Sequence, residues 1–334
     1  MEYKTVEKGI FNGINVVEYS MKNEELEVRF LNLGGAITKI ALASDDYSEN
    51  LVLAYENIES YFDNGCYLNT IIGRTSNRIK NGIFELNGQT INVDLNNGPN
   101  NLHGGAQCLT YANFDVIEIP SGYALTTTLP HQENGFPGNL SVKVCYLLDK
   151  NNFKVTYEAT TDQDTIVNLT QHAYFNLSGN LKENIYNHEL QIKADYVAEV
   201  DENLSFTTQL VPVKGTLFDF NQPTIVNHKS KEVLPLFEHT SGYDHLYLLS
   251  DIDHAVVFKH LDSNRTLKVS TTSPSMQFYA GNFLTPDLTF ENGRMGENHL
   301  GACFETHLVP FDFESQVLKP GEIYTQETTF TFTK

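Results

Sequence analysis

One carboxylate is set apart by its neighbours in the sequence. Glu305 follows Ala302, Cys303 and Phe304, an otherwise apolar stretch. Burying a carboxylate costs free energy unless it pairs with another group or has a chemical task. Glu305 is therefore the first candidate for acid–base chemistry in this chain.

Polar and ionisable side chains gather beside Gly and Asn in four parts of the chain, the last of which includes Glu305. Taken singly, each part also fits an ordinary turn, a hydrogen-bonded core histidine or a surface ion pair. Together they supply imidazole, guanidinium, carboxylate and amide groups. The parts are residues 73–79, residues 97–105, residues 168–176, and a C-terminal set at 242–245, 277–283 and 301–306.

The order and spacing of these parts resemble the aldose 1-epimerase family, the galactose mutarotases. The resemblance extends over residues 34–321, and several independent motifs in one order make it far more specific than any single motif. It is carried by Asn77-Arg78-Ile79 after Gly73-Arg74, His103-Gly104-Gly105, Asn168-Leu169-Thr170-x-His172-x-Tyr174-Phe175-Asn176-Leu177, Gly242-Tyr243-Asp244-His245, Gln277-x-Tyr279-x-Gly281-Asn282-Phe283 and Gly301-x-Cys303-x-Glu305-Thr306.

The resemblance implies a role for seven residues, position by position. Glu305 resembles the family's general base and His172 its general acid. The resemblance also implies a β-sandwich that holds a sugar in an open cleft on one sheet, and it implies neither a cofactor nor a metal. The positions that match the family's sugar-binding residues are Asn77, Arg78, His103, Asp244 and Gln277.

The reaction implied by the resemblance interconverts the α and β anomers of hexoses such as D-galactose and D-glucose. One proton leaves the C1 hydroxyl and another reaches the ring oxygen O5, so the ring opens, C1 turns about its bond to C2, and the ring recloses. A carboxylate base and a protonated imidazole suffice. From the pKa values of free Glu and His, we predict a bell-shaped pH profile with Glu305 on the acid limb and His172 on the alkaline limb. A nearby carboxylate should hold His172 charged for longer.

Three features depart from the family's pattern. His307 stands where Gln is common, Leu246 stands where we expect Pro or a small residue, and residues 308–315 lack the usual Pro-Asp-Ser pattern. We expect these departures to affect the rim of the site, and so the preferred sugar, while they leave the acid–base pair intact.

Charge and composition disfavour several classes of function. The chain has 334 residues, 42 acidic and 22 basic, for a net charge of −20. This balance disfavours binding to nucleic acid or to an anionic membrane. The sequence has no P-loop, no strand–GxGxxG–helix unit, no GxSxG or HExxH motif and no standard zinc spacing. The resemblance implies a small-molecule sugar as the partner of this chain, and we expect the chain to be a monomer or homodimer.

The expected location is the cytoplasm. The N-terminal residues have no apolar core of signal-peptide length, and no apolar run approaches the length of a membrane span. The four cysteines form no CxxC pair, so we expect reduced thiols in a reducing compartment.

The elements that must position these groups are strands. Apolar residues alternate with polar ones at residues 26–30, 142–148, 153–159 and 190–196, Asn87-Gly88 predicts a hairpin, and residues 328–333 predict a last strand. Helical periodicity is confined to residues 55–63. Since no linker or repeat divides the chain, we predict an all-β fold, a large antiparallel β-sandwich that forms a single domain over residues 1–334.

Three alternatives stay open at this point. A non-catalytic carbohydrate-binding protein would need no base and acid, so Glu305 with His172 argues against it. An epimerase for a related or phosphorylated sugar would need a basic cluster for the phosphate, whereas only Arg74 and Arg78 lie in a motif. A lyase or hydrolase would use two carboxylates in place of a carboxylate and His172.

Overall fold

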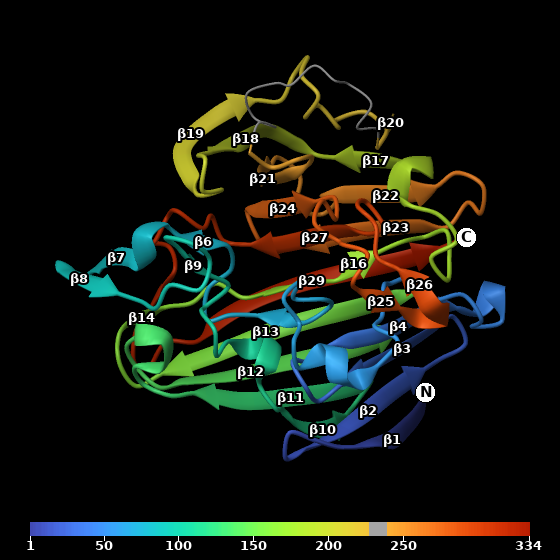
Figure 1. Cartoon of the computed structure of the whole chain (residues 1–334), viewed down its shortest axis with the longest axis horizontal. Helices are drawn as coiled ribbons and strands as arrows, with labels where there is room; N and C mark the ends of the chain where they lie inside the picture. The colour runs from blue at the N-terminus through green and yellow to red at the C-terminus, as the bar shows by residue number, and fades with distance from the viewer. Residues whose placement is uncertain (227–238) are drawn as a thin grey trace.

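The computed structural model of the chain describes residues 1–226 and 239–334. Its regular elements in these residues are β-strands and 3₁₀ helices of three or four residues. The all-β prediction is confirmed, and the strands form layered antiparallel sheets (Figure 1).

The largest layer is a nine-stranded antiparallel sheet. The predicted alternation holds along β13, where Phe153, Val155 and Tyr157 are buried and the residues between them are more exposed. The predicted last strand is confirmed as β29, which pairs with β13 and β23 in the middle of the sheet. In spatial order the strands are β10 (Asp115–Ile119), β11 (Gly122–Leu129), β12 (Leu140–Asp149), β13 (Asn152–Thr161), β29 (Tyr324–Thr333), β23 (Thr266–Thr271), β22 (Val256–His260), β17 (His188–Ile192) and β20 (Thr224–Ile225).

A six-stranded sheet forms the second layer. All residues of its central strands β24 and β27 are buried, which shows that both faces of this part of the sheet are covered. In spatial order the strands are β16 (Tyr174–Phe175), β27 (Ala302–His307), β24 (Ser275–Tyr279), β21 (Asp244–Leu249), β18 (Ala194–Val200) and β19 (Phe206–Pro212).

A four-stranded sheet and several two-stranded pairs complete the fold. The sheet runs β1 (Glu2–Phe11), β2 (Ile14–Lys22), β3 (Leu26–Leu31) and β4 (Ile37–Leu42). The pairs are β5 (Ile71–Ile72) with β15 (Thr170–Gln171), β6 (Arg78–Ile79) with β9 (Asn101–Leu102), β7 (Ile83–Leu86) with β8 (Gln89–Asn92), β14 (Thr165–Ile166) with β28 (Val317–Leu318), and β25 (Thr289–Phe290) with β26 (Arg294–Met295). The β7–β8 pair is the hairpin predicted at Asn87-Gly88. The 3₁₀ helices are η1 (Ala43–Asp45), η2 (Ile58–Tyr61), η3 (Lys80–Gly82), η4 (Leu109–Tyr111), η5 (Glu133–Gly135), η6 (Ile185–Asn187) and η8 (Glu291–Gly293).

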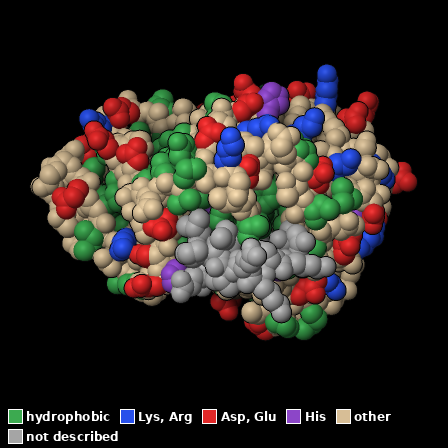
Figure 2. Space-filling model, turned by 90° about the horizontal axis from the view of Figure 1, so that it is seen from above, with side chains coloured by type: hydrophobic (Ala, Val, Ile, Leu, Met, Phe, Trp, Pro, Cys, Tyr) green, Lys and Arg blue, Asp and Glu red, His purple; other side chains and the backbone are tan. Residues whose placement is uncertain are grey.

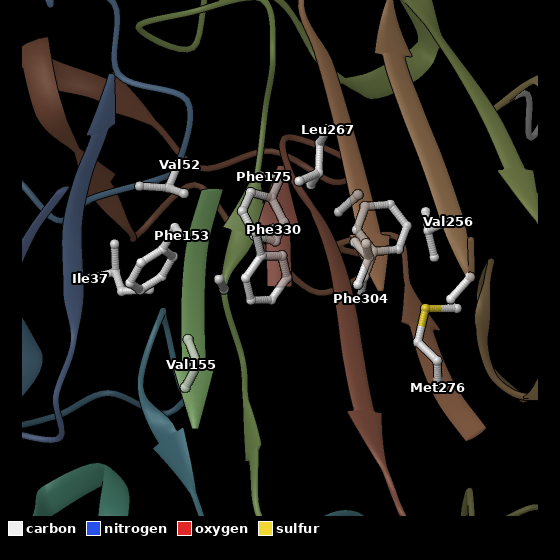
Figure 3. Packing of buried hydrophobic residues seen from close by; sticks show 14 of the residues in the cluster. Ile37, Val52, Phe153, Val155, Phe175, Val256, Leu267, Met276, Phe304 and Phe330 are labelled. Atoms are coloured by element: carbon white, nitrogen blue, oxygen red, sulfur yellow. The ribbon is translucent and has the colours of Figure 1, made fainter. Parts of the chain in front are cut away.

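Aromatic side chains join the two large sheets (Figure 3). Phe304 of β27 lies edge-on to Phe258 of β22, with ring centroids 5.2 Å apart, and Phe175 lies 5.3 Å from Phe330. Burial of such rings supplies the main driving force for packing one sheet on the other. The same apolar cluster includes residues of the four-stranded sheet. We propose on this basis that residues 1–334 form one domain.

Two predictions about local structure need correction. Residues 55–63 form no α-helix and contain only the single 3₁₀ turn η2. The run at residues 190–196 is not one strand, because β17 belongs to the nine-stranded sheet and β18 to the six-stranded sheet. A register shift between Ala194 and Tyr196 breaks the period of two, so Tyr196 is 44% exposed.

The surface agrees with the acidic composition. On the face shown in Figure 2, acidic and basic side chains are interspersed and gather in no basic patch. In the described residues, none of the helices has the length and apolar character that a membrane span requires.

Candidate active site

Neighbouring strands of the six-stranded sheet place three polar side chains side by side. Gln277 of β24 lies opposite Glu305 of β27, and Asp244 begins β21 on the other side of β24. Side chains alternate across a strand, so Phe304 points into the core while Glu305 points away from it, on the opposite face of the sheet. Nε2 of Gln277 donates to Oδ1 of Asp244 at 2.7 Å, which orients both side chains.

The other predicted residues come from loops next to two-residue strands. Arg78 begins β6 and pairs with Leu102 of β9, which brings His103 beside Asn77. The backbone N–H of Asn77 donates to Nδ1 of His103 at 3.3 Å, and the N–H of His103 donates to the Asn77 carbonyl at 3.1 Å. His103 has a φ of 55°, in the left-handed region that His adopts more often than most residues other than Gly.

His172 follows β15 and is held on several sides. Its backbone N–H donates to the Thr70 carbonyl at 3.0 Å. Its ring lies 5.1 Å from the ring of Tyr174 and 6.2 Å from that of Tyr67. Nδ1 lies 3.5 Å from Sγ of Cys303. These contacts fix the ring so that Nε2 points toward Glu305.

All seven predicted residues line one cavity of about 190 Å³. Sites for drug-sized ligands measure about 300–1,000 Å³, so this cavity suits a smaller molecule. Sequence reasoning assigned no role to the other residues of its lining. Tyr174, Tyr279 and Phe283 lie inside the recognised motifs, whereas no motif covers Tyr67. The remaining lining residues are Gly65, Cys66, Asn97 and Leu102.

Glu305 and His172 face each other in the wall of this cavity. Oε1 of Glu305 lies 3.4 Å from Nε2 of His172, and the two residues are 2% and 5% exposed. Among the described residues, Oε2 of Glu305 has no hydrogen-bond partner, nor has Oε1 of Gln277. Buried polar atoms are nearly always hydrogen-bonded. These two oxygens therefore mark where a polar ligand can bind.

The protonation of the pair differs from the prediction. Burial and the neighbouring Asp244 raise the pKa of Glu305 well above its usual range, although Arg78 opposes this. Burial lowers the pKa of His172 to about 4, so the prediction that a carboxylate would keep His172 charged is wrong. Both shifts have one cause, since loss of water penalises the charged form of each group. Both shifts therefore favour the neutral forms, a protonated Glu305 and an uncharged His172.

Two other charged groups set the field of the cavity. Burial raises the pKa of Asp244, against the effects of Arg78 and of the hydrogen bond from Gln277. Arg78 donates through Nε to Oδ1 of Asn97 at 3.0 Å, which turns its guanidinium along the cavity wall. The cavity thus combines two carboxyl groups with one cation.

A metal ion fits these residues poorly. Side-chain atoms of His103, His172 and Glu305 lie within 4.8 Å of one another, a spacing that could hold an ion. Nδ1 of His103 accepts a hydrogen bond from Asn77, so the neutral ring carries its proton on Nε2 and offers no lone pair to a metal there. That the site needs neither metal nor cofactor stays a prediction, and this hydrogen bond supports it.

Two residues that depart from the family's pattern, His307 and Leu246, do not lie at the rim of the cavity. His307 and Leu246 are fully buried and are not among the lining residues. Leu246 packs with Ala198, Val200 and Phe206 in an apolar cluster under β18 and β19. The expectation that these two residues shape the rim is therefore wrong.

Comparisons with known proteins agree with this arrangement. A family model described as aldose 1-epimerase matches residues 17–331. The chain is 35% identical to the galactose mutarotase of Sus scrofa, over 96% of this chain and 95% of that protein. It is 33% identical to the aldose 1-epimerase of Escherichia coli strain K12, over 93% of each. The crystal structure of galactose 1-epimerase from Lactobacillus acidophilus NCFM superposes with a TM-score of 0.88 at 26% identity, covering 99% of this chain and 98% of that one.

The burial of Glu305 leads to a prediction about stability. Because its pKa is raised in the folded state, the unfolded chain loses this proton at a lower pH than the folded chain. The free energy of unfolding therefore falls as the pH rises between the two values. Gln cannot ionise, so Glu305→Gln should raise Tm by about 1–4 °C, and more at about pH 8 than at about pH 5.

The measurement is calorimetry of both proteins at the two pH values. Glu118→Gln is the matched control, because Glu118 is exposed on β10, and its Tm should show no such pH-dependent gain. Equal Tm values for the wild type and Glu305→Gln at both pH values would contradict the burial argument.

Proposed function

Since the chain belongs to the aldose 1-epimerase family, we propose that Glu305 and His172 catalyse the interconversion of the α and β anomers of free hexoses such as D-galactose and D-glucose. The observation that carries this proposal is the buried pair itself, with Oε1 of Glu305 3.4 Å from Nε2 of His172 and Oε2 of Glu305 without a hydrogen-bond partner among the described residues. The enzyme is then an isomerase that moves protons and needs no redox step.

In the proposed reaction the sugar gives one proton to Glu305 and receives one proton from His172. Sugar hydroxyls that donate to Glu305 stabilise its carboxylate, so the shared proton passes to Nε2 of His172. Glu305 then takes the proton of the C1 hydroxyl while His172 protonates O5, and the C1–O5 bond breaks to give the open-chain aldehyde. After C1 has turned about its bond to C2, the ring closes on the other face with the proton transfers reversed.

The buried setting of the pair favours the ring-opening step. Once the ring is open, Glu305 is protonated and His172 is neutral, which is the protonation state that burial prefers. The charged pair that accompanies the closed ring, an ionised Glu305 and a protonated His172, is less stable in this buried setting than the neutral pair. Burial thus favours the proton transfers of ring opening once the charged pair has formed, while it adds to the cost of forming that pair, which the sugar hydroxyls must offset.

Sugar binding is assigned to donors and acceptors around the pair. Arg78 and Nε2 of His103 donate, while Asp244 and Oε1 of Gln277 accept, which suits a ligand whose hydroxyls do both. Phe283 is 48% exposed and its ring stacks 6.3 Å from that of Tyr279. We assign Phe283 as the apolar surface for one face of the sugar ring, a choice that the sequence left open.

The alternatives are less well supported. A binding protein would gain nothing from two buried groups with opposed pKa shifts. A phosphate dianion would meet Asp244 and Glu305 with Arg78 as the one cation of the lining. The free thiols of Cys66, Cys108, Cys145 and Cys303 are consistent with a reducing compartment. A cytoplasmic location and a monomeric or homodimeric state stay predictions.

The pH profile tests the assignment of the proton. Activity needs one proton on the pair, so the acid limb should appear where His172 takes up a second proton, near its pKa of about 4. The alkaline limb should follow the raised pKa of Glu305. We therefore expect a bell whose two limbs are exchanged relative to the assignment made from the free groups, and whose apparent pKa values belong to the coupled pair.

The measurement is kcat for D-galactose by polarimetry across the pH range, corrected at each pH for spontaneous mutarotation. The residual activity of Glu305→Gln should lack the alkaline limb, and an alkaline limb unchanged in that variant would contradict its assignment to Glu305.

Removal of either group tests catalysis directly. Glu305→Gln keeps the shape of the side chain but takes no proton, and His172→Gln delivers none. Each should lower kcat by about 10²–10⁴-fold with a modest change in KM. Glu118→Gln serves again as the exposed control and should keep the wild-type rate. Activity of Glu305→Gln within a few-fold of the wild type would rule out its role as the base.

Asp244 tests sugar recognition. Asp244→Ala removes an acceptor that the ring-closed sugar and the transition state use alike, so KM should rise by about tenfold or more, at least as much as kcat falls. The measurement is kcat and KM for D-galactose and for D-glucose, two sugars that differ only in the configuration of the hydroxyl at C4. If KM and kcat changed equally for both sugars, Asp244 would not discriminate between them. If KM did not change, Asp244 would not bind the sugar.

A further inference from the structure

A chain of hydrogen bonds runs behind the cavity wall and starts at His307. This residue lies two positions after Glu305 on β27, so both side chains leave the strand on the same face. His307 is 0% exposed. Its Nε2 lies 3.1 Å from Nδ2 of Asn77, and its Nδ1 lies 2.8 Å from the carbonyl oxygen of Leu308. The strand that carries the base is thereby joined to the loops beside β6 and β9, which lie next to it (Figure 1).

The partners of His307 decide which way the amide of Asn77 points. The Leu308 carbonyl can only accept, so Nδ1 of His307 carries the ring proton and Nε2 is the acceptor. Asn77 must then turn its NH₂ group toward His307, which leaves its Oδ1 for the cavity. Asn168 holds Leu308 in place, because its Nδ2 donates to the same carbonyl at 3.0 Å and its Oδ1 accepts from the Leu308 N–H at 2.9 Å.

Asn77 passes this constraint on to His103. Its backbone N–H donates to Nδ1 of His103, and its carbonyl accepts from the His103 N–H. Asn77 has a φ of 63°, a left-handed conformation that needs support from its surroundings. The bond to His307 supplies such support from the side chain, so the Nε2–H of His103 faces the cavity in a fixed direction.

We propose that His307 is a positioning residue for sugar binding, which accepts a hydrogen bond from Asn77 and thereby fixes Asn77 and His103 in the cavity wall. This inference rests on the proposed function. His307 is not among the cavity-lining residues, so it acts through Asn77 rather than on the sugar. Its effect should therefore appear in KM, while kcat, which depends on Glu305 and His172, changes little.

Two substitutions at one position test the acceptor. His307→Leu keeps an apolar volume but leaves the NH₂ group of Asn77 without a partner, whereas Oε1 of the side chain in His307→Gln can still accept from it. We expect His307→Leu to raise KM for D-galactose by about tenfold, which is the effect of about 1.4 kcal/mol, with kcat within about threefold of the wild type. His307→Gln should restore KM to within about threefold of the wild type.

The matched control is another buried histidine. His188 of β17 is also 0% exposed, and its Nε2 also accepts a hydrogen bond, from the Leu177 N–H at 3.0 Å. It is not among the cavity-lining residues. His188→Leu should lower Tm as His307→Leu does but should leave KM unchanged, which separates loss of stability from loss of positioning.

If His307→Leu fails to fold, a KM raised about tenfold in His307→Gln overturns the proposal. If it folds, a double-mutant cycle tests the coupling: in the Asn77→Ala background His307 has lost its partner, so His307→Leu should add no further change to KM. An additional rise in KM in that background would overturn the proposal. So would an unchanged KM in folded His307→Leu, or a His307→Gln variant as impaired as His307→Leu. A wild-type chain without mutarotase activity would refute the proposed function itself.

Discussion

Glu305 and His172 are both shielded from water, so solvent stabilises neither charge and burial favours the neutral form of each side chain. Placing a carboxyl group 3.4 Å from an imidazole in such a setting costs stability, because burial penalises the charged form of each. The rest of the site can be understood as the support that this arrangement needs. The strand β27 holds the carboxyl group, and aromatic rings hold the imidazole.

The alternation of side chains along a strand lets the six-stranded sheet contribute to the core on one face and to the active site on the other. Along β27, alternate residues turn toward the core, where Phe304 packs on Phe258, while Glu305 and His307 turn to the other side. Any shift of this strand by one residue would exchange the two sets and place a carboxyl group in the apolar layer. The packing of Phe304 therefore fixes the register, and the register fixes the position of Glu305.

The sequence predicted the all-β class, the strands with a regular period of two, the hairpin at Asn87-Gly88 and the residues that meet in the cavity. It failed where a property depends on three-dimensional surroundings. The run at residues 190–196 looks like one strand because periodicity does not reveal that the chain passes from one sheet to the other at Lys193. The direction of the His172 pKa shift depends on burial, which no motif encodes. Tyr67 lies in the cavity wall only because the loop after η2 folds over His103.

Several asparagines of the recognised motifs have a structural role, because they form hydrogen bonds to buried backbone groups. Part of the cavity wall comes from loops beside two-residue strands, where backbone groups lack the regular ladder of a sheet. Elsewhere around the site, buried amides bond backbone groups of segments outside the ladders: Asn168 bonds both backbone groups of Leu308, Asn176 donates to the Leu300 carbonyl at 2.7 Å, and Asn282 donates to the Tyr243 carbonyl at 3.0 Å. An unbonded buried backbone group costs about 1–3 kcal/mol, so each of these positions requires a side chain that can donate to a carbonyl, and Asn168 must also accept. The spacing that identifies the family is thus largely the spacing of its internal supports, and the reacting groups are the few residues that these supports leave facing the cavity.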